Sequence, residues 1–147
     1  MTRSAAREIA IRLSFFAAAR GRDTDELISA FFDREYYATL FPEDELFSKY
    51  PNKKQLAYIT ELVKGVASRR GELDAVIEKY SKGWKVKRIS KTAAAVLRCC
   101  IFEILYMDEV PDAAAICEAV ELSKNYDEPE TTAFINGILG SVARKEL

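Results

Sequence analysis

Residues 84–107 read WKVKRISKTAAAVLRCCIFEILYM and contain the most apolar stretch of the chain. From Thr92 to Met107, thirteen of the sixteen residues are apolar, so a helix formed there would be covered by other helices on nearly all sides. Ser90 or Thr92 can cap its start, and Pro111 marks its end because proline lacks the amide that a further turn would need. The sequence therefore predicts a core helix around which the rest of the chain packs.

A run of positive charge leads into this helix. Its seven cations, with no acid between them, are Lys79, Lys82, Lys85, Lys87, Arg88, Lys91 and Arg98. The net charge of the chain is only −1, so basic function depends on this uneven distribution. Because unopposed cations repel one another, the run indicates an anionic partner. A solvated surface is the alternative.

The remaining pattern is helical throughout. Of the 147 residues 49% are hydrophobic, and only ten are glycine or proline, six and four respectively, which favours one compact helical domain. Hydrophobic periodicity and capping residues predict about seven helices and no strand. Besides the core helix, we expect helices at residues 3–20, 23–38, 52–70, 73–80, 112–126 and from 127 to about 145.

Capping signals set several of these boundaries. Asp23 with Glu26, and Asp127 with Glu130, have capping-box spacing. Asn52 and Gln55 restart the helical pattern after a loop with two prolines. Gly71 is expected to separate the helices on either side of it.

The first helix has two faces of interest. Its expected core stripe is Ile9, Leu13, Phe16 and Ala17. A second stripe, with a spacing of four residues, is Arg3, Arg7, Ile11 and Phe15. Two guanidinium groups followed by an aromatic ring could face RNA. Alternatively, the helix start is solvated and Phe15 packs on a neighbouring helix.

The last helix offers an aromatic ring beside its core stripe. The stripe is expected to be Thr131, Ile135, Ile138, Leu139 and Val142. Phe134 lies about 100° from its centre, beside Glu130 and Gly137. A base could stack on an exposed Phe134, or the ring could close the edge of the core.

Arg98 interrupts the core helix and has two interpretations. Lys91, Ala94 and Ala95 share its face, and the small alanines leave room for a phosphate beside the guanidinium. The alternative is a structural arginine that caps a helix or pairs with an acid such as Glu103 or Glu118.

Signals for catalysis, metal binding and membrane insertion are weak. The chain has no histidine and no nucleophile-elbow, P-loop or dinucleotide-binding motif, so we expect no enzyme, metal or cofactor. The core stretch is too short for a membrane span and contains Arg98 and Glu103. Cys99, Cys100 and Cys117 lie in apolar helical pattern without C-x-x-C spacing, which suggests free thiols in the cytoplasm.

Six segments together resemble the NusB family of transcription antitermination factors. They are LVKGV at 62–66, LDAVIEKY at 73–80, W-x-V-x-R-I at 84–89, AVLRCCIFEILYMDEVP at 95–111, AICEAVELSKNY at 115–126 and FINGIL at 134–139. The resemblance implies an all-α fold of two packed helical subdomains, at about residues 1–70 and 71–147. It also implies binding of boxA single-stranded RNA together with NusE, a ribosomal small-subunit protein. The resulting RNA polymerase complex would read through terminators on ribosomal RNA operons.

The resemblance also assigns site residues. Family members contact RNA through an arginine-rich amino-terminal segment, the arginines of the W-x-x-x-R and L-R motifs, and the helix start before F-[VI]-N-G. The matching positions in this sequence are Arg3, Arg7, Phe15, Lys87, Arg88, Arg98, Glu130 and Phe134.

Three positions depart from the family pattern, which changes the RNA affinity that we expect. Phe15 stands where tyrosine is common, Cys117 where asparagine is common, and Ala133 where lysine can occur. We therefore expect this protein to bind RNA weakly by itself and to depend strongly on NusE.

Two other functions are compatible with the sequence. One is a NusB-like domain linked to ribosomal RNA modification, which would require a following catalytic domain. Another is a protein-binding scaffold or homodimer with a solvated basic surface.

Overall fold

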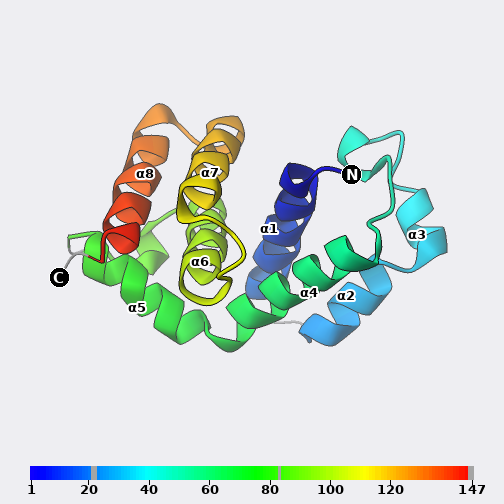
Figure 1. The fold of residues 1–147 in the computed structure, drawn as a ribbon, viewed down its shortest axis with the longest axis horizontal. Coiled ribbons are helices and arrows are strands. Elements are labelled where there is room, and N and C mark those ends of the chain that lie inside the picture. The colour runs from blue at the N-terminus through cyan, green and yellow to red at the C-terminus, as the bar shows by residue number, and fades with distance from the viewer. Residues whose placement is uncertain (21–22, 83, 146–147) are drawn as a thin grey trace. The chain divides into compact units, whose positions relative to one another are not determined.

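A computed structural model describes residues 1–20, 23–82 and 84–145 (Figure 1). These residues form eight α-helices and two 3₁₀ helices and include no strand, which confirms the predicted all-α class. The elements are α1 (Arg3–Arg20), α2 (Thr24–Phe31), α3 (Arg34–Ala38), η1 (Glu45–Phe47), α4 (Lys53–Ser68), α5 (Arg70–Tyr80), η2 (Val86–Arg88), α6 (Lys91–Tyr106), α7 (Asp112–Tyr126) and α8 (Pro129–Ala143).

The chain divides into two compact units, Met1–Ala67 and Ser68–Leu147. Each has its own buried apolar side chains, including Ile59 in the first and Ile101 in the second, both fully buried. Within the described ranges, no helix has the length and hydropathy needed to cross a membrane.

In the first unit, α1 buries Ala6, Ile9, Ala10 and Leu13, at the i, i+3, i+4 and i+7 spacing of one helix face. The predicted core positions Ile9 and Leu13 are confirmed. The prediction for Phe16 is wrong, since this side chain is 46% exposed. Ser14 is the last fully buried residue of α1, and Ala17, which was also expected in the core stripe, is only half-buried.

The single helix expected at residues 23–38 is two helices. Asp23 caps α2 as predicted, because its carboxylate accepts from the amides of Asp25 and Glu26 at 2.8 and 3.2 Å. Asp33 then starts α3 in the same way, accepting from the amides of Glu35 and Tyr36 at 3.0 and 3.2 Å. An aspartate at an N-cap has a non-helical backbone, so the chain turns there and the count rises above seven.

Aromatic side chains fill the space beyond this turn. Tyr37 contacts the rings of Phe31, Phe47 and Tyr50 edge to face at 5.0 to 5.8 Å. Its hydroxyl donates a hydrogen bond of 2.9 Å to the carbonyl of Lys49. Burial, with a smaller contribution from Tyr50, raises the pKa of Tyr37 to about 12.

Helix α4 begins where Asn52 and Gln55 were expected to restart the helical pattern, and these two residues form a reciprocal cap. The amide of Asn52 donates to Oε1 of Gln55 at 2.9 Å, and the amide of Gln55 donates to Oδ1 of Asn52 at 2.8 Å. The Gln55 side chain also donates to the carbonyl of Met1 at 2.6 Å, which ties the chain start to α4.

In the second unit, α6 is the core helix that the sequence predicts. It packs against α5, α7 and α8 (Figure 1), and residues 93–103 are buried without interruption. Ser90 rather than Thr92 is its cap, with Oγ accepting from the amide of Ala93 at 3.0 Å. A helix buried on all sides forms because its apolar residues leave no polar face.

Two helix boundaries and one core position in this unit differ from the prediction. Gly71 lies inside α5, and the break from α4 falls at Arg69. Thr132, not Thr131, belongs to the core stripe of α8 and is 7% exposed. Asp127 caps no helix start: it follows α7, and Pro129 opens α8 without a side-chain cap.

Candidate nucleic-acid interface

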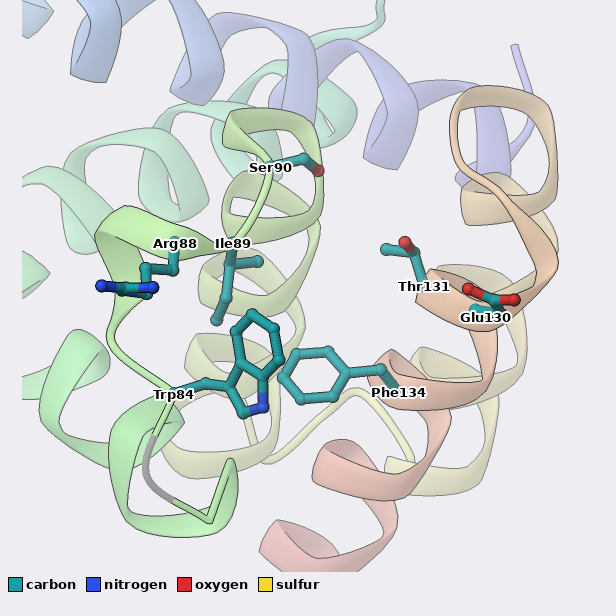
Figure 2. A pocket seen from close by; sticks show the side chains of 7 residues that line it. All are labelled: Trp84, Arg88, Ile89, Ser90, Glu130, Thr131 and Phe134. Atoms are coloured by element: carbon teal, nitrogen blue, oxygen red, sulfur yellow. The ribbon is translucent and has the colours of Figure 1, made fainter.

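A pocket in the second unit brings together three of the predicted site residues. It has a volume of about 300 Å³, at the lower end of the range of roughly 300–1,000 Å³ typical of ligand sites. Figure 2 shows its two sides, one from the segment before α6 and one from the start of α8. The lining residues are Trp84, Arg88, Ile89, Ser90, Glu130, Thr131 and Phe134.

The side before α6 is shaped by backbone hydrogen bonds. Ser81 Oγ donates to the carbonyl of Trp84 at 2.7 Å, and the Glu78 carboxylate accepts from the amide of Val86 at 3.0 Å. These bonds set the turn that leads into η2, where Lys87 and Arg88 are both exposed. Arg88 lines the pocket, whereas Lys87 lies beside it in sequence.

Four polar side chains join this side to α7 and α8. Ser90 Oγ donates to Asp127 Oδ1 at 3.2 Å, and Ser123 Oγ donates to Asp127 Oδ2 at 3.5 Å. The hydroxyls of Ser123 and Thr132 are hydrogen-bonded at 3.0 Å, in a buried position. Ser90 therefore links the start of α6 to the α7–α8 turn, and the carboxylate expected to cap α8 is used for this link.

The α8 side presents an aromatic ring and a carboxylate. Phe134 is half-buried and points into the pocket, so its ring is accessible while part of it contacts the protein. Glu130 is exposed at the first turn of α8. A carboxylate only accepts hydrogen bonds, so Glu130 can bind amino groups of a ligand, whereas Arg88 can bind a phosphate.

Trp84 was not among the predicted site residues, although it is the first residue of the W-x-V-x-R-I segment. Its side chain is 54% exposed and lines the pocket opposite Phe134 (Figure 2). A tryptophan in a short connecting segment has no periodic pattern to indicate its role. Its proximity to a tightly spaced run of cations was the one available signal.

Arg98 lies elsewhere in the second unit, in a different environment. It is 5% exposed, and its Nε and Nη2 donate to the two carboxylate oxygens of Asp74 at 2.6 and 3.3 Å. An acid therefore binds this arginine, as the structural alternative expected, but the acid comes from α5 instead of being Glu103 or Glu118. Arg98 does not line the pocket.

The predicted residues of α1 belong to the first unit. Arg3 is exposed, with its guanidinium 5.1 Å from the centre of the Tyr58 ring. Arg7 is only 3% exposed and lies 5.9 Å from the same ring. Phe15 is half-buried and contacts Phe16 edge to face at 5.9 Å. The helix start thus combines an exposed and a buried arginine around one tyrosine.

Across residues 1–20, 23–82 and 84–145, no three His, Cys, Asp or Glu side chains are grouped so that they could hold a metal ion. Cys99, Cys100 and Cys117 are free thiols, of which the first two are buried like small apolar residues and Cys117 is exposed.

Comparison with known proteins gives full-length matches. Transcription antitermination protein NusB of Acetivibrio thermocellus is 42% identical over 147 residues, covering 100% of this chain and 92% of the relative. The NusB protein of Ruminiclostridium cellulolyticum is 38% identical with the same coverage.

Solved structures show the same fold. T. maritima NusB superposes with a TM-score of 0.80 at 23% identity, covering 99% of this chain and 92% of that one. A chain from the crystal structure of antitermination factors NusB and NusE in complex with double-stranded RNA gives a TM-score of 0.76 at 21% identity, with 97% and 96% coverage. The NusB family model matches residues 4–144. The chain belongs to the NusB family.

Proposed function

We propose that this chain is an RNA-binding transcription antitermination factor without catalytic activity. It binds boxA RNA together with NusE in the cytoplasm and helps RNA polymerase to read through terminators on ribosomal RNA operons. The full-length relatives that carry the name transcription antitermination protein support this proposal, as does the related structure that contains NusB, NusE and RNA.

The observation that carries the proposal is the convergence of Arg88, Glu130 and Phe134 on one pocket. These residues come from segments more than forty positions apart in sequence, yet they combine a cation, an acceptor and an aromatic ring. Single-stranded RNA offers matching groups: phosphates, base amino groups and base faces. The pocket can therefore hold an unpaired nucleotide.

The proposed roles follow the exposure of each side chain. Arg3, Lys87 and Arg88 are exposed and are assigned to phosphates, while Phe134 stacks on a base. Phe15 is half-buried and is assigned to a base edge. Further RNA contacts are assigned to Arg7 and Arg98, which are 3% and 5% exposed, so only an edge of each side chain would reach RNA.

The test is fluorescence anisotropy of a labelled boxA RNA and a scrambled RNA of equal length, with and without NusE, at two salt concentrations. We expect a preference for boxA that NusE strengthens and salt weakens, because phosphate contacts release counterions. Equal weak binding of both RNAs under all conditions contradicts the proposal and favours a protein scaffold.

Arg88→Ala tests the pocket within this assay. Loss of one phosphate contact should weaken binding to both RNAs and reduce the salt slope by about 1. Lys124→Ala is the matched control, since Lys124 is an exposed cation of the same unit that pairs with Glu121 and does not line the pocket. Unchanged salt slopes in both variants would remove Arg88 from the phosphate site.

A further inference from the structure

We propose that Trp84 is a second base-stacking residue, so that one unpaired nucleobase is held between its indole and the ring of Phe134. This inference rests on the proposed RNA-binding function and specifies how the same pocket holds its ligand. It assigns a role to a side chain for which neither the sequence pattern nor the fold requires one.

The exposure of Trp84 is the first argument. An indole buries well and stabilises a core when it is covered, yet that of Trp84 is 54% exposed. Its position is nevertheless fixed through the backbone, since the Trp84 carbonyl accepts from Ser81 Oγ at 2.7 Å and its amide donates to the Ser81 carbonyl at 3.4 Å. The segment thus leaves more than half of the Trp84 surface accessible to a ligand.

The geometry of the pocket is the second argument. Figure 2 shows the Trp84 and Phe134 rings extending toward one another from opposite sides of the pocket. The volume of about 300 Å³ suits a single planar ring system rather than a helix or strand of a partner. Stacking between two aromatic side chains tolerates any base, because every base has a π-face.

Charge selects RNA as the occupant. Between Trp84 and Lys91 the chain carries four cations, Lys85, Lys87, Arg88 and Lys91, and no acid. Lys85 lies 3.8 Å from Glu78, which offsets part of this charge, but Arg88 is itself one of the residues that line the pocket. A nucleotide places a phosphate on each side of its stacked base, and aromatic rings flanked by cations are the combination that binds single strands. An apolar side chain of a protein partner would pack on the rings but would offer no negative charge to the cations.

The test uses the fact that Trp84 is the only tryptophan of the chain, so its fluorescence reports on this position alone. Unlabelled boxA RNA should quench the emission, with the same midpoint as the anisotropy titration of labelled boxA. Trp84→Ala should weaken RNA binding roughly five-fold to a hundred-fold, the effect of removing one stacked pair. Trp84→Phe keeps a ring and should bind within about three-fold of the original protein.

Phe41→Ala serves as a matched control, because Phe41 is another exposed aromatic residue, 48% accessible, that does not line the pocket. It should leave both RNA binding and Trp84 quenching unchanged. Helical circular dichroism checks the fold of each variant, and if Trp84→Ala does not fold, quenching of Trp84 by boxA RNA in the original protein decides the stacking role.

Three outcomes are distinguishable from the expected one. Binding of boxA without quenching, and with Trp84→Ala equal to the original protein, overturns the stacking role and leaves the antitermination proposal intact. Absence of boxA binding in the anisotropy assay, with NusE present, overturns both. Quenching by NusE without RNA, together with loss of NusE binding in Trp84→Ala, assigns the indole to a protein contact and also overturns the inference.

Discussion

Arg88 and Arg98 are ten positions apart in sequence, yet their surroundings differ completely. Arg88 is exposed at a pocket, whereas Arg98 is bound by the Asp74 carboxylate. Sequence similarity to the family assigns both to RNA. The fold gives them different surroundings: Arg98 donates two hydrogen bonds to Asp74 in a low-exposure site, so its removal leaves that carboxylate without its partner.

Arg98→Ala should lower the free energy of unfolding by about 2 to 3 kcal/mol. The loss is smaller than for a fully buried pair, because the Asp74 side chain is 25% exposed and Arg70 lies 3.9 Å from it. Urea unfolding followed by circular dichroism measures this, with Arg88→Ala as the control expected to change stability by less than about 0.5 kcal/mol. If the two variants were equally stable, the pair would contribute nothing to folding.

The raised pKa of Tyr37 predicts that the first unit loses folding stability at alkaline pH. Its pKa is raised to about 12 in the folded protein from 10.0, so the folded state holds this proton more tightly than the unfolded state. Its contribution to stability is therefore complete below pH 10 and is lost between about pH 10 and pH 12. Tyr37→Phe should reduce the fall in stability between pH 9 and pH 11 by about 1 kcal/mol.

The measurement is urea unfolding of both proteins at each pH. Tyr36→Phe is the matched control, because Tyr36 is 49% exposed and its replacement should leave the pH dependence as it is. Identical pH profiles for Tyr37→Phe and the original protein would contradict the assigned pKa.

At the scale of elements, the shape of the pocket depends on the start of α6. Ser90 caps the helix through Ala93 and also donates to Asp127. Ser90→Ala should cost about 1 kcal/mol of stability and also weaken RNA binding, since the residue lines the pocket. Ser90→Asp retains the cap but brings a second carboxylate toward Asp127, so it should recover less than the full stability.

Thermal unfolding and the anisotropy assay together measure these effects. The control is Asn52→Ala, which removes a cap of α4 in the other unit. It should cost similar stability without the change in RNA binding. Equal effects of Ser90→Ala and Asn52→Ala on RNA binding would show that the pocket does not depend on its cap.

Sequence-based predictions were correct where the interacting residues are close in sequence and wrong where they are distant in sequence. The caps at Asp23, Asn52 and Ser90 were predictable because each side chain bonds to an amide within three residues. The predicted cap at Asp127 was wrong because a hydroxyl 37 residues away binds its carboxylate. A local pattern contains no information about such a partner.

The same contrast between local and long-range interactions applies to the candidate site. Helix periodicity placed Phe134 beside the core stripe and next to Glu130, but left open whether the ring is exposed or closes the edge of the core. The pairing of Arg98 with Asp74, 24 residues away, was not predictable, because several acids were equally plausible. Trp84 was missed because an isolated residue in a connecting segment has no periodicity that distinguishes a ligand contact from a packing role.

At the scale of the whole molecule, the near-zero net charge limits the affinity of this protein for RNA in the absence of NusE. With a net charge of −1, long-range attraction for RNA is weak, and binding depends on the local cations near the pocket. Glu130 on the pocket itself opposes them. We expect boxA affinity to rise at least ten-fold when NusE is added, because contacts from two proteins on one RNA act together.

Anisotropy titrations with and without saturating NusE measure this ratio. A scrambled RNA is the control and should gain less from NusE than boxA does. Equal boxA affinities in the two titrations would contradict the dependence, and light scattering of the free protein would then show whether a homodimer supplies the second set of contacts.

The hydroxyl and carboxylate links from Ser90 through Asp127 and Ser123 to Thr132 connect both sides of the pocket. Ser123 is completely buried, so this connection forms with the core. The two sides are thereby held in register before any ligand arrives, and association with RNA loses little conformational entropy from the protein. Most of the ordering cost on binding then falls on the RNA strand, so a more flexible strand should lose more conformational entropy when it enters this site.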